Sequence, residues 1–221
     1  TEDGVRKMEK LLNVDNIYIW DYEYEAIISR MGIHSNTTVV GPILWYTDGG
    51  EKNRKAKINL TLCIFDVTPQ SIENLDSRGV LSTYYDVENA SLFINDIISA
   101  VKEVEKQLQC NICIIMKQKR EPSEKHSQNY ASLLNDLENN NLISILPSDT
   151  SLYELANQSD LSISFPFTSS AYVFSFKRKK AIFYDSTMKI HGQQYVRNNI
   201  YFTSGYQQLV NTLKSLLKAH G

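Results

Sequence analysis

Three consecutive hydroxyl residues follow an apolar run in the last third of the chain. The run is Leu161 to Phe165, and Thr168, Ser169 and Ser170 come after a Pro-containing turn, at the start of a predicted helix. A helix start carries unpaired backbone N–H groups and a partial positive charge, so hydroxyl residues there predict a phosphate site. The alternative is ordinary N-capping, for which Ser and Thr are preferred residues anyway.

A cationic stretch follows a second apolar run. The run Asn111 to Met116 is followed directly by Lys117, Lys119 and Arg120. Basic side chains at the end of a strand suit an anion such as a phosphate or a diphosphate, whereas the alternative is a solvated basic loop. If both runs are parallel strands of one sheet, their carboxyl ends share an edge. We therefore expect the cationic loop and the hydroxyl loop to meet there around an anion.

Other polar residues also follow predicted strands. Asp66 and Thr68 follow the strand that ends at Phe65, and His126 is the histidine nearest the cationic loop. These three residues are further candidates for ligand contact, although a surface or capping role is the alternative for His126. A last group is expected to begin a helix after the strand that ends at Leu146: Ser148, Asp149, Thr150 and Ser151, with Glu154 in the first turn.

The elements that position these residues alternate between strand and helix from residue 57 to residue 221. Predicted strands occupy 57–65, 111–116, 142–146, 161–165, 181–184 and 199–203, and predicted helices include 86–109, 125–139 and 206–219. This alternation predicts an α/β fold with a Rossmann-like, doubly wound parallel sheet of five or six strands and helices on both faces. Residues 1–45 read as strand, helix and strand, and the polar stretch 46–56 reads as a linker.

Composition excludes several classes of function. The net charge of the 221 residues is −2, without a broad basic field, so we expect no nucleic acid partner. No apolar run approaches the roughly 20 residues that cross a bilayer, so membrane association is expected to be peripheral at most. The sequence opens without Met in a charged helical segment, so we expect it to be part of a longer protein. The chain contains neither the Gly-x-Gly-x-x-Gly fingerprint nor a Walker motif.

Metal and redox sites are not expected. The four histidines are scattered, and no two have the spacing of ligands on one helix. Cys110 and Cys113 form a Cys-x-x-Cys, but without a second pair we expect core packing of Cys113 instead of zinc or redox chemistry. A cytoplasmic, reduced setting fits this cysteine usage, and the inner face of the cell membrane is the alternative location.

The order of these motifs resembles the carboxyl-terminal half of GT-B glycosyltransferases, similar to those that use CMP-activated sialic acid or Kdo in bacterial surface polysaccharide biosynthesis. Residues 15–20, a helix and Val39-Val40-Gly41-Pro42 look like the end of the acceptor-side domain and its hinge. Lys117-Gln118-Lys119-Arg120 stands where such enzymes carry a Lys-x-His-Pro loop. Residues 165–170 stand where they carry the hydroxyls that hold the donor phosphate. Two departures are Lys119-Arg120 in place of His-Pro, and Asp66-Val67-Thr68-Pro69 in place of a glycine-rich loop.

This resemblance implies a function and a set of partners. Residues 57–221 would bind a CMP- or UDP-sugar as substrate and need no other cofactor, and the carbohydrate acceptor would be held with the acceptor-side domain. Lys117, Lys119, Arg120, Thr168, Ser169 and Ser170 would hold the donor phosphate, and the group from Ser148 to Ser151 with Glu154 would contact the base or ribose. By itself the chain would bind the donor without turning it over. The alternatives are a non-hydrolysing sugar-nucleotide epimerase and a non-catalytic Rossmann-like partner domain.

Overall fold

The computed structural model describes residues 14–20, 22–30, 32–43, 60–79, 84–121, 123–190, 196–197 and 199–218. The chain divides into two compact units, Thr1–Tyr46 and Thr47–Gly221. The predicted linker, residues 46–56, lies outside the described residues.

The first unit contains the predicted strand, helix and strand, and its two strands pair in parallel. Strand β1 (Asn16–Ile19) pairs with β2 (Asn36–Val39), and helix α2 (Tyr22–Arg30) connects them. Gly32 follows the helix with a φ of +75°, a left-handed conformation that glycine adopts without steric cost. Ile19 and Ile28 are the apolar side chains that are buried among the described residues of this unit.

The second unit is built on a seven-stranded sheet with the strand order β5-β4-β3-β6-β7-β9-β8. The strands are β3 (Leu60–Phe65), β4 (Ile112–Lys117), β5 (Ser144–Leu146), β6 (Leu161–Ser164), β7 (Lys180–Asp185), β8 (Val196–Arg197) and β9 (Ile200–Ser204). Six of them are parallel, and β8 pairs antiparallel with β9 at the edge. Counted along the chain, the six parallel strands have the order 3-2-1-4-5-6, which is the Rossmann order.

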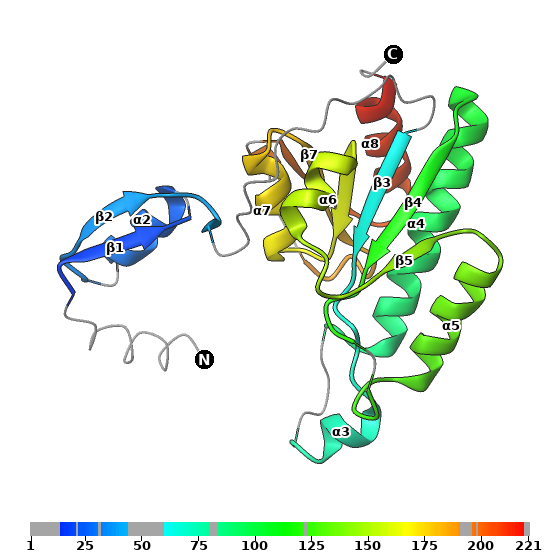
Figure 1. The fold of residues 1–221 in the computed structure, drawn as a ribbon, viewed down its shortest axis with the longest axis horizontal. Coiled ribbons are helices and arrows are strands. Elements are labelled where there is room, and N and C mark those ends of the chain that lie inside the picture. The colour runs from blue at the N-terminus through cyan, green and yellow to red at the C-terminus, as the bar shows by residue number, and fades with distance from the viewer. Residues whose placement is uncertain are drawn as a thin grey trace. The chain divides into compact units, whose positions relative to one another are not determined.

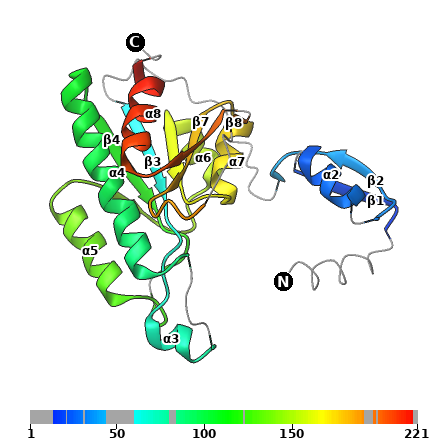
Figure 2. The ribbon, with the colours of Figure 1, turned by 180° about the vertical axis from the view of Figure 1, so that it is seen from behind.

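Helices cover both faces of this sheet (Figures 1 and 2). They are α4 (Val87–Leu108), α5 (Gln128–Asn139), α6 (Leu152–Gln158), α7 (Ser169–Phe176) and α8 (Tyr206–Lys218), whereas the short helix α3 (Ile72–Asp76) lies beyond the end of β3 and covers neither face. Helix α4 packs against α5 and α8 on one face, and α6 packs against α7 on the other. The predicted α/β, Rossmann-like fold is confirmed. Helix α3 and strand β8 were not expected from the sequence.

The longest helix, α4, shows why these residues fold as they do. The Asp86 carboxylate accepts a hydrogen bond of 2.8 Å from the Asn89 N–H and caps the helix start. Gln109 ends the helix with a φ of +52°. Between these caps, residues at helical spacing are buried, including Phe93, whose ring stacks on that of Phe165 with centroids 4.0 Å apart. The helix is therefore fixed against the strand that ends at the hydroxyl loop.

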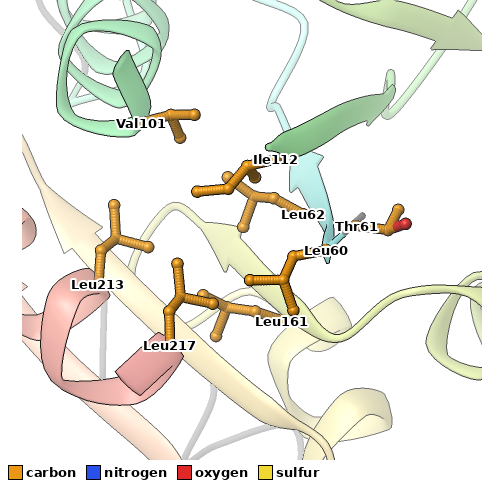
Figure 3. Close-up of a pocket in the computed structure, with 8 residues that line it drawn as sticks. All are labelled: Leu60, Thr61, Leu62, Val101, Ile112, Leu161, Leu213 and Leu217. Atoms are coloured by element: carbon orange, nitrogen blue, oxygen red, sulfur yellow. The ribbon is translucent and has the colours of Figure 1, made fainter. Parts of the chain in front are cut away.

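A small apolar cavity lies at the amino ends of β3, β4 and β6, beneath α4 and α8 (Figure 3). Its volume is about 10 Å³, at the lower limit of the ~10–15 Å³ that one water molecule needs. The lining residues are Leu60, Thr61, Leu62, Val101, Ile112, Leu161, Leu213 and Leu217. The cavity is far too small for a ligand, so it is a packing defect of the core.

Candidate functional site

The carboxyl edge of the sheet carries both of the predicted loops. Strands β3 and β6 are neighbours at the centre, and the chain leaves β3 toward α4 and β6 toward α7, on opposite faces. In such sheets, ligands bind beyond the strand ends at this reversal. The cationic loop follows β4 and the hydroxyl loop follows β6, so the loop after β3 lies between them. Arg120 and Ser169 therefore belong to loops on one edge of the sheet.

A cavity of about 290 Å³ opens at this edge, between the loops after β3 and β4. Three of its lining residues are cationic, namely Arg78, Lys119 and Arg120, and all three side chains are exposed. Tyr85 adds an aromatic ring that is 43% exposed. The remaining lining residues are Val67, Thr68, Pro69, Gln70 and Leu75. Among the described residues that line this cavity none is acidic, so it is suited to an anion.

Asp66 holds the two loops together. Its buried carboxylate oxygen Oδ1 accepts hydrogen bonds from the Lys119 N–H at 2.8 Å and from the Thr68 hydroxyl at 3.2 Å. The Thr68 hydroxyl in turn accepts a hydrogen bond of 3.2 Å from the Arg120 N–H. Thr68 has a φ of +48°, an uncommon left-handed conformation that these contacts maintain. Asp66 and Thr68 thus position the backbone of both cations.

Burial controls the ionisation of Asp66. The residue is 4% exposed, and this desolvation raises its pKa from the ordinary 3.8 to about 6. The hydrogen bonds from Lys119 and Thr68 and the nearby Tyr130 hydroxyl act in the opposite direction. Asp66 Oδ2 and the Tyr130 hydroxyl make no hydrogen bond of good geometry, although they are close together. The carboxylate is therefore held at an energetic cost near neutral pH.

Lys117 connects the cationic loop to the loop after β5 and does not line the cavity. Its ammonium group donates hydrogen bonds to the carbonyl oxygens of Ser148 and Gln118. The Ser148 N–H donates to Glu121 Oε1 at 3.0 Å, which gives the two loops a second connection. Partial burial lowers the pKa of Lys117, while the nearby Asp66 raises it. Lys117 therefore links the end of β4 to the loop after β5 through a hydrogen bond.

The residues predicted to contact base or ribose lie in the loop after β5 and in α6. Ser151 is the N-cap of α6 and accepts a hydrogen bond from the Glu154 N–H, as the capping pattern predicted. Asp149 and Glu154 are exposed, and Ser148 and Thr150 are partly buried. These residues lie on the same edge of the sheet but do not line the cavity.

The hydroxyl loop follows β6 at the same edge of the sheet, and its residues do not line the cavity. Thr168 is at the N-cap position of α7, but its hydroxyl makes no capping bond and donates instead to the Phe165 carbonyl at 2.9 Å. The hydroxyls of Thr168 and Ser170 are 3.3 Å apart. Ser170 is buried, whereas Thr168 and Ser169 are partly exposed. The cavity thus includes the cationic loop without the hydroxyl loop.

His126 supports the loop after β3. It forms an isolated antiparallel bridge with Gln70, and its ring Nδ1 accepts a hydrogen bond of 3.0 Å from the Ser123 N–H. Partial burial and the neighbouring Arg120 both lower its pKa. A largely neutral ring at physiological pH fits this supporting role.

The cation Arg78 and the aromatic residue Tyr85 in the lining were missed from the sequence, as were Val67, Pro69, Gln70 and Leu75. Arg78 follows α3, in a stretch that was expected to be a long loop. The signal for this helix was Ser71, which caps α3 by accepting a hydrogen bond from the Asn74 N–H. Tyr85 directly precedes the Asp86 cap of α4, and only the folded chain brings it to the cavity.

The described residues contain no group of three or more His, Cys, Asp and Glu that could hold a metal ion. Cys63, Cys110 and Cys113 are free thiols. The expectation that Cys113 packs in the core was wrong. Residues of β4 alternate between buried and more exposed positions, and Cys113 is on the exposed side.

Comparison with known families shows to which protein family the chain belongs. The model of a family described as polysaccharide biosynthesis PFTS motif protein matches residues 1–213. The chain belongs to this family. The letters of that description occur in this sequence as Pro166-Phe167-Thr168-Ser169, the turn between β6 and α7. A search of curated proteins finds no match. Among the described helices, none combines the length and apolar character that crossing a membrane requires.

Proposed function

We propose that this polysaccharide biosynthesis protein is the donor-binding part of a glycosyltransferase and takes a sugar activated by a nucleotide such as CMP or UDP. The cationic cavity beside β3, the first strand of a Rossmann-order sheet, is the observation that carries the proposal. Sugar transfer releases the nucleotide as an anion, and fixed cations stabilise the charge that develops on it.

The lining residues have distinct roles in this proposal. Arg78, Lys119 and Arg120 neutralise the phosphate groups, and the N–H groups of Lys119 and Arg120 are fixed by Asp66 and Thr68. The exposed ring of Tyr85 stacks on the base, a contact worth about 1–3 kcal/mol for an aromatic side chain.

The neighbouring loops contact the parts of the donor that extend beyond the cavity. The loop after β5, with Ser148, Asp149, Thr150, Ser151 and Glu154, is adjacent to the cationic loop through the Lys117 and Glu121 hydrogen bonds and reaches the ribose. Thr168, Ser169 and Ser170 follow the strand on the other side of β3 and face the sugar-phosphate end. The acceptor-side domain, of which residues 1–45 form the end, holds the carbohydrate acceptor and supplies the general base.

The test is a calorimetric titration of the chain with CMP, UDP and GDP. At least one nucleotide is expected to bind, and the paired substitution of Lys119→Ala with Arg120→Ala is expected to weaken it about 10- to 100-fold, the usual effect of losing charge-assisted hydrogen bonds. Substituting side chains here retains the Lys119 N–H that Asp66 binds.

Lys106→Ala is the matched control. Lys106 is an exposed cation in the last turn of α4, which precedes β4 and so lies toward the amino edge of the sheet. Its loss should leave nucleotide affinity unchanged. Millimolar nucleotide that neither binds nor stabilises the wild-type chain would contradict the proposal and favour a non-catalytic partner domain. Product formed without an acceptor would favour an epimerase.

A further inference from the structure

Phe167 combines two features that are unfavourable for folding. The side chain is 56% exposed, although Phe is normally buried. Its φ is +61°, a left-handed conformation that is a genuine outlier for a bulky residue. Such strain persists where surrounding structure enforces it, and it is concentrated at ligand-binding sites.

The turn that contains Phe167 makes the residue choice more unusual. Pro166 occupies the second position of the turn and Phe167 the third, in a left-handed conformation. This is the pattern of a type II turn, in which the third residue is normally Gly or Asn. Either of those residues would make the same turn with less backbone strain. An exposed aromatic ring at this position therefore points to a role beyond connecting β6 with α7.

The ring is held in place without being covered. Its centroid is 5.7 Å from that of Phe183 and 6.3 Å from that of Phe202, on the neighbouring strands β7 and β9. The hydrogen bond from the Thr168 hydroxyl to the Phe165 carbonyl joins the two ends of the turn. The aromatic ring of Phe167 is thus fixed in position and exposed at the carboxyl edge of the sheet.

We propose that Phe167 binds a sugar ring by stacking, and that the hydroxyls of the partly exposed residues Thr168 and Ser169 bond the rim of that sugar, with Thr168 as an acceptor because its own proton goes to the Phe165 carbonyl. One face of a pyranose presents C–H groups, which an aromatic face attracts, while its rim presents hydroxyls. The aromatic ring of Phe167 suits the C–H face of the sugar, and the hydroxyl residues that directly follow it suit the hydroxyl rim. The site goes beyond the nucleotide cavity and rests on the family's role in polysaccharide biosynthesis.

A purely apolar partner would make less use of this arrangement. Met188, in the loop after β7, is 61% exposed, so the edge does present a second apolar side chain. However, the residues that directly follow Phe167 are polar, which favours a carbohydrate over a lipid or an apolar protein surface.

The experiment compares three substitutions at this position in the full-length protein, using melting temperature and the polysaccharide yield of cells that carry each variant. Phe167→Asn, which suits a positive φ, should leave the melting temperature unchanged or raise it by about 2–4 °C, and should lower the polysaccharide yield at least about tenfold. Phe167→Trp should retain the yield, because it retains an aromatic face. Phe167→Leu should lose it, because it retains only apolar volume.

Phe176→Leu is the matched control, since Phe176 is 51% exposed at the far end of α7, and this change should not alter the yield. A drop of several degrees for Phe167→Asn would overturn the proposal in favour of a structural role. A normal yield for Phe167→Asn, or for Phe167→Leu, would overturn it in favour of no role or of apolar docking.

A parallel titration separates the donor sugar from the acceptor sugar. Wild type and Phe167→Asn are titrated with UDP, CMP and GDP, and with UDP-glucose, UDP-N-acetylglucosamine, GDP-mannose and CMP-sialic acid. A donor site predicts that the variant loses affinity for the activated sugar but not for its nucleotide. An acceptor site predicts that both affinities stay unchanged while the yield falls. If no nucleotide binds to the wild-type protein, the proposed nucleotide cavity is contradicted. The polysaccharide yields of the Phe167 variants would still test the proposed sugar site by themselves.

Discussion

Replacing Asp66 with Asn should stabilise the protein at neutral pH. In the folded chain, burial raises the pKa of Asp66 from 3.8 to about 6. Between these two values the folded protein keeps a proton that the unfolded chain has lost, so its stability falls as the pH rises. A difference of one pKa unit corresponds to about 1.4 kcal/mol. Above pH 6 the ionised Asp66 therefore lowers the free energy of unfolding by about 3 kcal/mol relative to an uncharged side chain at this position.

Asn removes the charge and retains an oxygen that can accept the hydrogen bonds from Lys119 and Thr68. At about pH 7.5 the free energy of unfolding of Asp66→Asn should exceed that of wild type by up to about 3 kcal/mol, and at about pH 4 the two should be equal. Asp66→Ala removes the acceptor as well and should be less stable than Asp66→Asn by about 1–3 kcal/mol.

Urea unfolding followed by far-ultraviolet circular dichroism, over a series of pH values, measures these differences. Tryptophan fluorescence is unsuitable, because both tryptophans, Trp20 and Trp45, come before residue 47, at which the unit that contains Asp66 begins. Equal pH profiles for wild type and Asp66→Asn would refute the argument that a buried, ionised Asp66 destabilises the fold. A lower stability of Asp66→Asn at every pH would show that the charge itself holds the two loops.

Two further predictions concern packing and hydrogen bonding. Val101→Ile adds a methyl group beside the cavity of about 10 Å³ and should raise the free energy of unfolding by about 0.5–1 kcal/mol in urea titration, whereas a loss of that size would mean that the cavity has no room. Asp185→Ala should lower the free energy of unfolding by about 3–5 kcal/mol. The reason is that the buried Asp185 carboxylate accepts hydrogen bonds from the Tyr84 hydroxyl, from the N–H and hydroxyl of Thr187 and from the Ile190 N–H. Asp185→Asn, which retains one acceptor oxygen, should lose less, and an unchanged melting curve for Asp185→Ala would contradict the assigned hydrogen bonds.

Local patterns were sufficient to predict the six parallel strands of the sheet, but not its edge strand β8. Apolar runs bounded by turn residues gave the six parallel strands, and capping residues such as Asp86 and Ser151 gave the helix starts. Both signals act over a few residues, so they can be recognised without knowing the fold. The five-residue helix α3 was missed because it buries no side chain and therefore leaves little apolar pattern.

The candidate site was only partly predictable. The sequence placed the cationic loop and the hydroxyl loop after parallel strands, and both lie at the carboxyl edge. It did not indicate that Lys119 and Arg120 line a cavity with Arg78 and Tyr85 while Lys117 points to another loop. Which side chains share a cavity depends on the paths of loops that are distant along the chain.

The sequence by itself determined which segments become the six parallel strands and the longer helices, and hence which loops lie at the ligand-binding edge, because hydrophobic periodicity and capping are local properties. Tertiary structure decided which of those loops touch. Asp66 joins the loop after β3 to a loop about fifty residues later, and the ring of Phe167 is held by strands that follow it in the chain. Contacts of this kind, and the left-handed backbone of Thr68 and Phe167 that accompanies them, arise only when the sheet has assembled.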